Sequence, residues 1–315
     1  MANSELIAAQ VVRVPTGIAN CYVVGTPERW ILIDAGTQGN ANNIREAVAE
    51  HIGPDSTPAA IVLTHGHFDH AGSARDLAES WDVEIYAHRL EIPFLNGNSR
   101  YPPPDPTVGG FMSQVIRFLP NKKMDVGPRL REISVGRLPW LPEWEIIETP
   151  GHAPGHVSYF RSEDSALIAG DAFCTVDQNS MTDTLSQRQK VSIPPPYYTC
   201  DWKAAERSVK KLAELRPKLL AAGHGIPMRG AQATTELRAL ANNFADAAPQ
   251  DGRYVRESAR TDETGIVYLP PPVADPVKIG ALIAAGFAGA VGAGMLIRNR
   301  RRNIVPESES IEEAA

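Results

Sequence analysis

Potential metal ligands are concentrated in a few short turns, and this concentration constrains the fold more than any other feature of the sequence. The segment THGHFDH, residues 64–70, holds three of the chain's eight histidines and one aspartate. It follows an apolar run that predicts a buried strand. His65 and His67 would point to opposite faces of a regular strand, so they can converge only in a turn. If a helix begins near His70, Asp69 and His70 lie in its first turn and face the same pocket.

Three further segments place potential ligands directly after apolar runs. They are TPGHAPGH (149–156), AGDAF (169–173) and AAGHG (221–225). Each contains glycine, which favours a turn. Open α/β sheets usually place their sites at the carboxyl ends of strands. The sequence therefore predicts that these four turns lie together at one edge of a sheet.

The rest of the chain predicts alternation of strands and helices, which is typical of an α/β fold. The expected strands are 21–25, 30–36, 59–65, 83–88, 144–150, 157–160, 166–171 and 218–225. The expected helices are 40–52, 71–81, 201–215 and 231–244. Residues 96–128 are rich in proline, glycine and aromatic residues, and we expect this long insertion to form a pocket wall or lid.

The residue types in the four turns suit a divalent metal. Neutral imidazoles and carboxylates bind zinc at about 2.0–2.2 Å. Because the clusters contain no cysteine, ligand type alone also allows iron or manganese. Crowding these groups around a buried point is costly unless a cation compensates. We therefore expect a metal centre, with two ions favoured.

With these motifs in order, the chain resembles the metallo-β-lactamase-fold hydrolases over roughly residues 7 to 245. It is similar in particular to the uncharacterised bacterial metallo-hydrolase branch, near the glyoxalase II and lactonase enzymes. WILIDAG (30–36) and the region PPPYYTCDWKAAERSVKKL (194–212) fit the same resemblance. It implies an αββα sandwich with the metals at one edge of the two sheets.

The resemblance also implies a ligand for each motif position and a reaction. His65, His67 and His152 match the ligands of one metal. Asp69, His70 and His224 match those of the other, and Asp171 matches the carboxylate that bridges both. The ions would be divalent, with zinc favoured over iron or manganese. A metal-bridging hydroxide would attack a carboxylic ester, thioester or lactone carbonyl, with Asp69 also acting as general base.

Other residues are expected to support the centre or bind substrate. Asp34 is expected to orient the ligands, and His156 to make a structural hydrogen bond. The expected substrate-binding residues are Phe111, Met112, Tyr197 and Tyr198. A small-molecule substrate is expected, and the net charge of −6 argues against nucleic-acid binding.

Two alternatives remain open beside the hydrolase. One is a persulfide dioxygenase with a single iron, although His70 and His224 favour two metals. The other is a non-catalytic, membrane-tethered binding protein. The substrate is also open: Cys174 stands where related lactonases often have tyrosine, and Gly66 stands where glyoxalase II enzymes have a further histidine.

The C-terminal part of the chain predicts an anchor rather than a site. We expect a catalytic domain over 1–245, a linker over 246–278, an apolar transmembrane helix over 279–297 and a charged tail over 298–315. The stretch 279–297 carries no charged residue and is about long enough to cross a bilayer. Because no export signal is visible, we expect a membrane-associated protein with a cytoplasmic catalytic domain.

Overall fold

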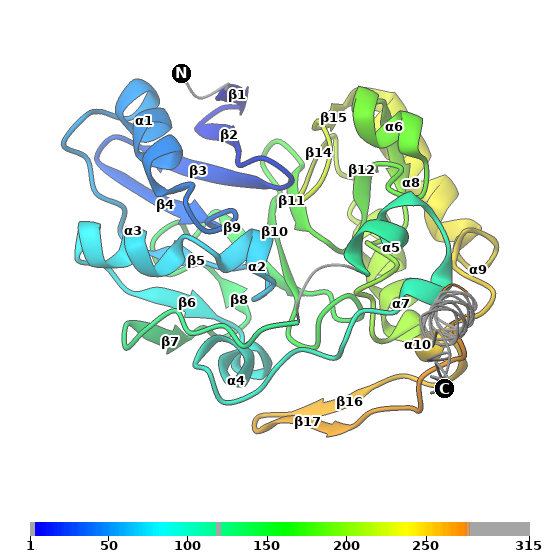
Figure 1. The fold of residues 1–315 in the computed structure, drawn as a ribbon. Coiled ribbons are helices and arrows are strands. Elements are labelled where there is room, and N and C mark those ends of the chain that lie inside the picture. The colour runs from blue at the N-terminus through cyan, green and yellow to red at the C-terminus, as the bar shows by residue number, and fades with distance from the viewer. Residues whose placement is uncertain (1–3, 118–120, 276, 278–315) are drawn as a thin grey trace, which may run out of the picture. The chain divides into compact units, whose positions relative to one another are not determined.

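The computed structural model describes residues 4–117, 121–275 and 277. The chain divides into two units, Met1–Pro272 and Val273–Ala315. The first unit is a mixed α/β structure in which two β-sheets lie between two groups of helices, and it carries every element named below (Figure 1).

The first sheet has seven strands in sequential order, from β1 to β7. Its first four strands are antiparallel neighbours, and β4 to β7 pair in parallel. The strands are β1 (Glu5–Ala8), β2 (Val11–Pro15), β3 (Asn20–Thr26), β4 (Arg29–Ile33), β5 (Ile61–Val62), β6 (Ile85–Ala87) and β7 (Leu130–Glu132). Parallel neighbours require crossover connections. Helix α1 (Ala41–His51) lies in the connection from β4 to β5, and α2 (Phe68–Ala71) and α3 (Ala74–Trp81) lie in the connection from β5 to β6.

The second sheet has six strands in the order β15-β14-β11-β10-β9-β8, and only β11 and β14 pair in parallel. The strands are β8 (Gly136–Arg137), β9 (Trp144–Glu148), β10 (Val157–Arg161), β11 (Ala166–Gly170), β14 (Leu219–Ala222) and β15 (Met228–Arg229). Helices α7 (Trp202–Glu214) and α8 (Gly230–Asn242) belong to this half.

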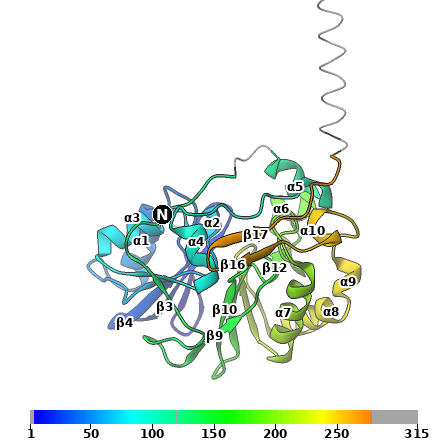
Figure 2. The same ribbon diagram turned by 90° about the horizontal axis from the view of Figure 1, so that it is seen from below.

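Alternating side chains on the strands separate the core into layers. On β4, Leu32 packs in one apolar cluster with Ile44 of α1 and Leu77 of α3. Its neighbour Ile33 belongs to a different cluster, which includes Ile168 of the second sheet. A third cluster joins the other face of the second sheet to α7 and α8. The layers therefore run helix, sheet, sheet, helix, as the resemblance implied (Figure 2).

The regions expected to be irregular or linking contain short elements that local patterns do not predict. Residues 96–128 include η2 (Pro106–Val108) and α5 (Phe111–Ile116). The expected linker 246–278 includes α10 (Arg253–Arg256) and a hairpin of β16 (Arg260–Asp262) and β17 (Gly265–Tyr268). The buried Tyr254 donates a hydrogen bond to the Pro103 carbonyl at 2.7 Å. These elements therefore depend on distant contacts. The remaining elements are η1 (Arg89–Glu91), α4 (Ile92–Leu95), β12 (Cys174–Val176), α6 (Met181–Ser186), β13 (Gln189–Ser192) and α9 (Phe244–Ala247).

Within the part of the chain that the structure describes, no helix combines the length and apolarity needed to cross a membrane. The predicted transmembrane segment 279–297 and the charged tail 298–315 lie outside the described residues. The membrane anchor therefore stays a prediction.

Candidate metal centre

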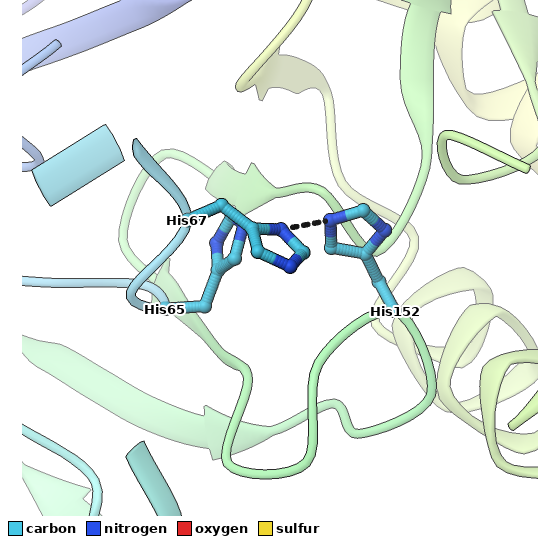
Figure 3. Close-up of side chains that lie close together, drawn as sticks. All are labelled: His65, His67 and His152. Atoms are coloured by element: carbon cyan, nitrogen blue, oxygen red, sulfur yellow. Dashed lines mark hydrogen bonds between the residues drawn. The ribbon is translucent and has the colours of Figure 1, made fainter. Parts of the chain in front are cut away.

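Turns that follow β5, β9, β11 and β14 bring their side chains together at one end of the sandwich. In the first group, His67 Nδ1 lies 3.0 Å from His65 Nε2 and 3.0 Å from His152 Nε2. Figure 3 shows the three imidazoles turned toward one another. The turn at Gly66 is what allows His65 and His67 to converge, as the sequence predicts.

A second group lies beside the first, and Asp171 contacts both. The second group consists of Asp69, His70 and His224. Asp171 Oδ2 lies 3.1 Å from His224 Nε2 and 3.3 Å from His152 Nε2. Asp171 Oδ1 lies 3.4 Å from His70 Nε2. The structure thus brings together all seven side chains that the sequence nominates, and all seven are buried.

Hydrogen bonds to residues outside the cluster determine which nitrogen of each imidazole is free to bind a metal ion. His224 Nδ1 lies 2.8 Å from the Ile18 carbonyl oxygen. Since a carbonyl can only accept, Nδ1 carries the proton and Nε2 of the neutral ring presents a lone pair. His70 Nδ1 lies 2.8 Å from Asp34 Oδ2, which also only accepts when ionised. Both Nε2 atoms therefore face the carboxylates of the centre.

The same reasoning applies to His65. Thr64 donates its hydroxyl proton to Asp34 Oδ2 at 2.8 Å, so its oxygen must accept from His65 Nδ1, 3.0 Å away. The Nε2 atom of His65 is then unprotonated, and its lone pair points toward His67. Such an arrangement of inward lone pairs is the usual one for metal-ligating histidines held by a carboxylate or carbonyl.

Electrostatics at the centre also calls for a cation. His70 Nε2 and Asp171 Oδ1 are buried and have no hydrogen-bond partner among the described residues. Burial opposes the charged form of His70, but Asp171, Asp34 and Asp69 outweigh it and raise its pKa well above the ordinary range. The carboxylates therefore demand positive charge, which protons or metal ions can supply. The donor set of imidazoles and carboxylates fits two divalent ions.

Asp34 and His156 support the centre in the way expected of them. Asp34, at a φ of +59°, accepts from the Thr64 N–H at 2.7 Å as well as orienting His70. His156 Nε2 accepts from the Asp171 N–H at 2.9 Å. The backbone that carries Asp171 is therefore fixed by a side chain from the same turn as His152.

A buried carboxylate that the sequence does not reveal joins two of the ligand turns. Glu91 Oε2 accepts from the Gly66 N–H at 2.9 Å, and Oε1 accepts from the Gly155 N–H at 2.6 Å. The Tyr101 hydroxyl also donates to Glu91. A Cβ at Gly66 would lie 2.6 Å from this hydroxyl, so a larger residue there would displace Tyr101. No local pattern around Glu91 distinguishes it from an ordinary helical glutamate.

A pocket of about 260 Å³ opens beside the second group of candidate ligands. Its lining includes Asp69 and His224, together with three of the four expected substrate-binding residues, Met112, Tyr197 and Tyr198. Phe111 is not part of the lining, whereas Ile116 at the other end of α5 is. The Tyr198 ring packs against the His67 imidazole with their centroids 4.6 Å apart, so this tyrosine reaches both the pocket and the centre.

Comparisons with known proteins find related sequences and a related fold. The chain is 40% identical to the probable metallo-hydrolase YflN of Bacillus subtilis, over 72% of this chain and 88% of that protein. It is 28% identical to the hydroxyacylglutathione hydrolase GloC of Haemophilus influenzae, over 48% of this chain and 65% of that protein. The BLEG-1 B3 metallo-beta-lactamase structure has a TM-score of 0.53 at 24% identity, covering 72% of this chain and 98% of that one, and shows the shared fold. A family model matches residues 14–224, and the chain thus belongs to the metallo-beta-lactamase superfamily.

Proposed function

We propose that the chain is a dinuclear metal-dependent hydrolase that cleaves a carboxylic ester, thioester or lactone. The observation that carries this proposal is the position of Asp171, whose two oxygens contact ligands of both groups. A single-metal site would not need His70 and His224 in this arrangement. The name of the H. influenzae relative, a hydroxyacylglutathione hydrolase, supports an acylated substrate.

Two divalent cations, with zinc favoured, would polarise the acyl carbonyl and lower the pKa of a water towards about 7. The chain's own residues would do the remaining work. Asp69 lines the pocket, and its Oδ2 lies 3.5 Å from His224 Nε2. We assign Asp69 the role of general base: it accepts the proton that the water loses when the water oxygen bonds to the acyl carbon. That proton then reaches the departing oxygen or sulfur as the acyl bond breaks.

We assign to Tyr198 the donation of a hydrogen bond to the substrate. Burial and the nearby Asp69 both raise the pKa of its hydroxyl, so the phenol stays neutral and keeps its proton. Its ring lies against His67 and also lines the pocket. Related lactonases often have a tyrosine at the position of Cys174, which is fully buried here and has no hydroxyl. Tyr198 can supply that hydroxyl instead.

The direct test combines metal analysis with a panel of esters, thioesters and lactones. We expect two metal ions per chain and hydrolysis of at least one acyl class, lost on chelation and restored by zinc. One iron per chain with oxygen consumption would replace the hydrolase with a mononuclear dioxygenase. Full metal loading without turnover of any acyl class would instead favour a binding protein.

Replacing Tyr198 with phenylalanine should lower kcat by about 10²-fold, which is typical for loss of one donor to a developing oxyanion. The metal content should not change, because the ring that packs on His67 is retained. Steady-state kinetics and metal analysis of Tyr198→Phe measure the two effects. Tyr197→Phe is the matched control, since the Tyr197 hydroxyl donates to Gln178 Oε1 at 2.8 Å. Equal losses in both variants would contradict the role of Tyr198.

A further inference from the structure

We propose that the substrate carries a negatively charged group, such as a carboxylate, which Arg13 binds in the pocket beside the metal centre. This inference rests on the proposed hydrolase function and narrows its substrate to anionic acyl compounds. Arg13 lies on β2 and lines the same pocket as Asp69 and His224. A molecule in that pocket can therefore touch the centre and Arg13 at once.

The guanidinium of Arg13 is held in place, but its charge is poorly compensated. Its Nε donates to Asn20 Oδ1 at 2.8 Å, which is a neutral partner. Its Nη1 lies 3.9 Å from Glu5 Oε2, and the side chains of Arg13 and Glu5 are 13% and 55% exposed. An ion pair this long with an exposed carboxylate contributes little stabilisation. A largely buried guanidinium would be better stabilised by an anion that reaches its remaining N–H groups.

Asn20 connects the position of Arg13 to the turn that carries His224. The Asn20 amide nitrogen donates to the Ala222 carbonyl at 3.0 Å and to the Gly225 carbonyl at 2.8 Å. Its amide oxygen is then free to accept from Arg13. All the hydrogen-bonding groups of this amide are thus used to hold the cation in a fixed relation to a metal-ligand turn.

The rest of the pocket indicates a substrate with one anionic group and an otherwise apolar acyl chain. Among the described residues that line it, Arg13 is the one arginine or lysine. Apolar side chains make up much of the remaining wall: Ile18, Phe68, Met112, Ile116 and Val176. An apolar acyl chain with a terminal anion would therefore match the pocket. Its carbonyl would lie at the metal centre and its anion at the planar fork of Arg13.

The test compares two esters that differ only at the end of the acyl chain. The glutaryl ester ends in a carboxylate, and the pentanoyl ester of the same alcohol ends in a methyl group. We expect the zinc-loaded full chain to prefer the glutaryl ester in kcat/KM. In Arg13→Met this preference should fall by about 10- to 100-fold, the worth of one charge-assisted hydrogen bond, mainly through KM. Arg13→Lys should keep part of it, because it retains the charge without the fork.

Arg29→Met is the matched control, because it removes an exposed arginine that does not line the pocket. It should keep the full preference, which separates direct binding from a general effect of net charge. Binding of free glutarate, measured by calorimetry, gives a readout that does not need turnover. It should weaken in Arg13→Met and remain in Arg29→Met.

The possible failures of the two ideas can be told apart. Hydrolysis of both esters without preference, with glutarate binding unaffected in Arg13→Met, would overturn the role of Arg13 and leave the hydrolase intact. Absence of hydrolysis of any acyl compound would overturn the hydrolase, and the glutarate titration would still decide whether Arg13 binds anions. Thermal melting and metal content of each variant establish that it is folded.

Discussion

Replacing Asp171 with asparagine should lower kcat/KM by about 10³-fold or more, or roughly 4 kcal/mol of transition-state stabilisation. Asp171 contacts His152 of one group and both His70 and His224 of the other. An asparagine has nearly the same shape but lacks the negative charge that the two proposed cations would share. We therefore expect Asp171→Asn to lose at least one metal ion per chain, which elemental analysis alongside kinetics would measure.

Asp76→Asn provides the control, because it makes the same chemical change at an exposed position on α3. It should retain both metals and full activity. If Asp171→Asn also kept two metals and its rate, Asp171 would not bridge the centre, and the proposal of a dinuclear hydrolase would lose its main support. A variant with one metal and little activity would agree with the proposal.

The clustering of the seven candidate ligands could be predicted from sequence because each motif is local. His65, His67, Asp69 and His70 lie in one turn and the first residues of α2, so their spacing determines much of their geometry. The apolar runs before the four turns also predicted the strands that position them. Strand ends in an α/β fold converge, so the four turns could be expected to meet without knowledge of each contact.

Residues that act through distant contacts could not be predicted in this way. Arg13 sits in the run VVRVP, which matches any half-buried strand. Its environment depends on Asn20 and on a turn about 200 residues further along the chain. In α5, Ile116 lines the pocket and Phe111 does not, a difference that depends on how this short helix packs. Likewise, the hairpin β16–β17 presents Ile266 to a cluster with Phe94 and Tyr101, which composition does not reveal.

The buried Glu91 gives the largest expected effect on stability. Glu91→Ala would leave the Gly155 N–H and the Tyr101 hydroxyl proton without their acceptor, whereas the Gly66 N–H keeps the Tyr101 oxygen at 2.8 Å. An unsatisfied buried donor costs about 1–3 kcal/mol, so the free energy of unfolding should fall by about 2–6 kcal/mol. Because Glu91 joins the turns that carry His65, His67 and His152, affinity for the metal at this trio should fall by about 10- to 100-fold. Denaturant unfolding of the metal-free chain and metal titration measure the two effects separately.

Two further variants distinguish a specific connection between the turns from simple loss of packing. Tyr101→Phe removes the hydroxyl but keeps the Glu91 carboxylate on both N–H groups, so it should cost only about 1 kcal/mol and little metal affinity. Glu91→Gln keeps the size and one acceptor oxygen, but its amide NH₂ would face the other N–H. It should therefore fall between the wild type and Glu91→Ala in both stability and metal affinity.

If Glu91→Ala unfolded like the wild type and held both metals as tightly, the two ligand turns would be positioned without Glu91. Equal losses of metal affinity in Tyr101→Phe and Glu91→Ala would instead assign the effect to the Tyr101 hydroxyl, which accepts from the Gly66 N–H at 2.8 Å.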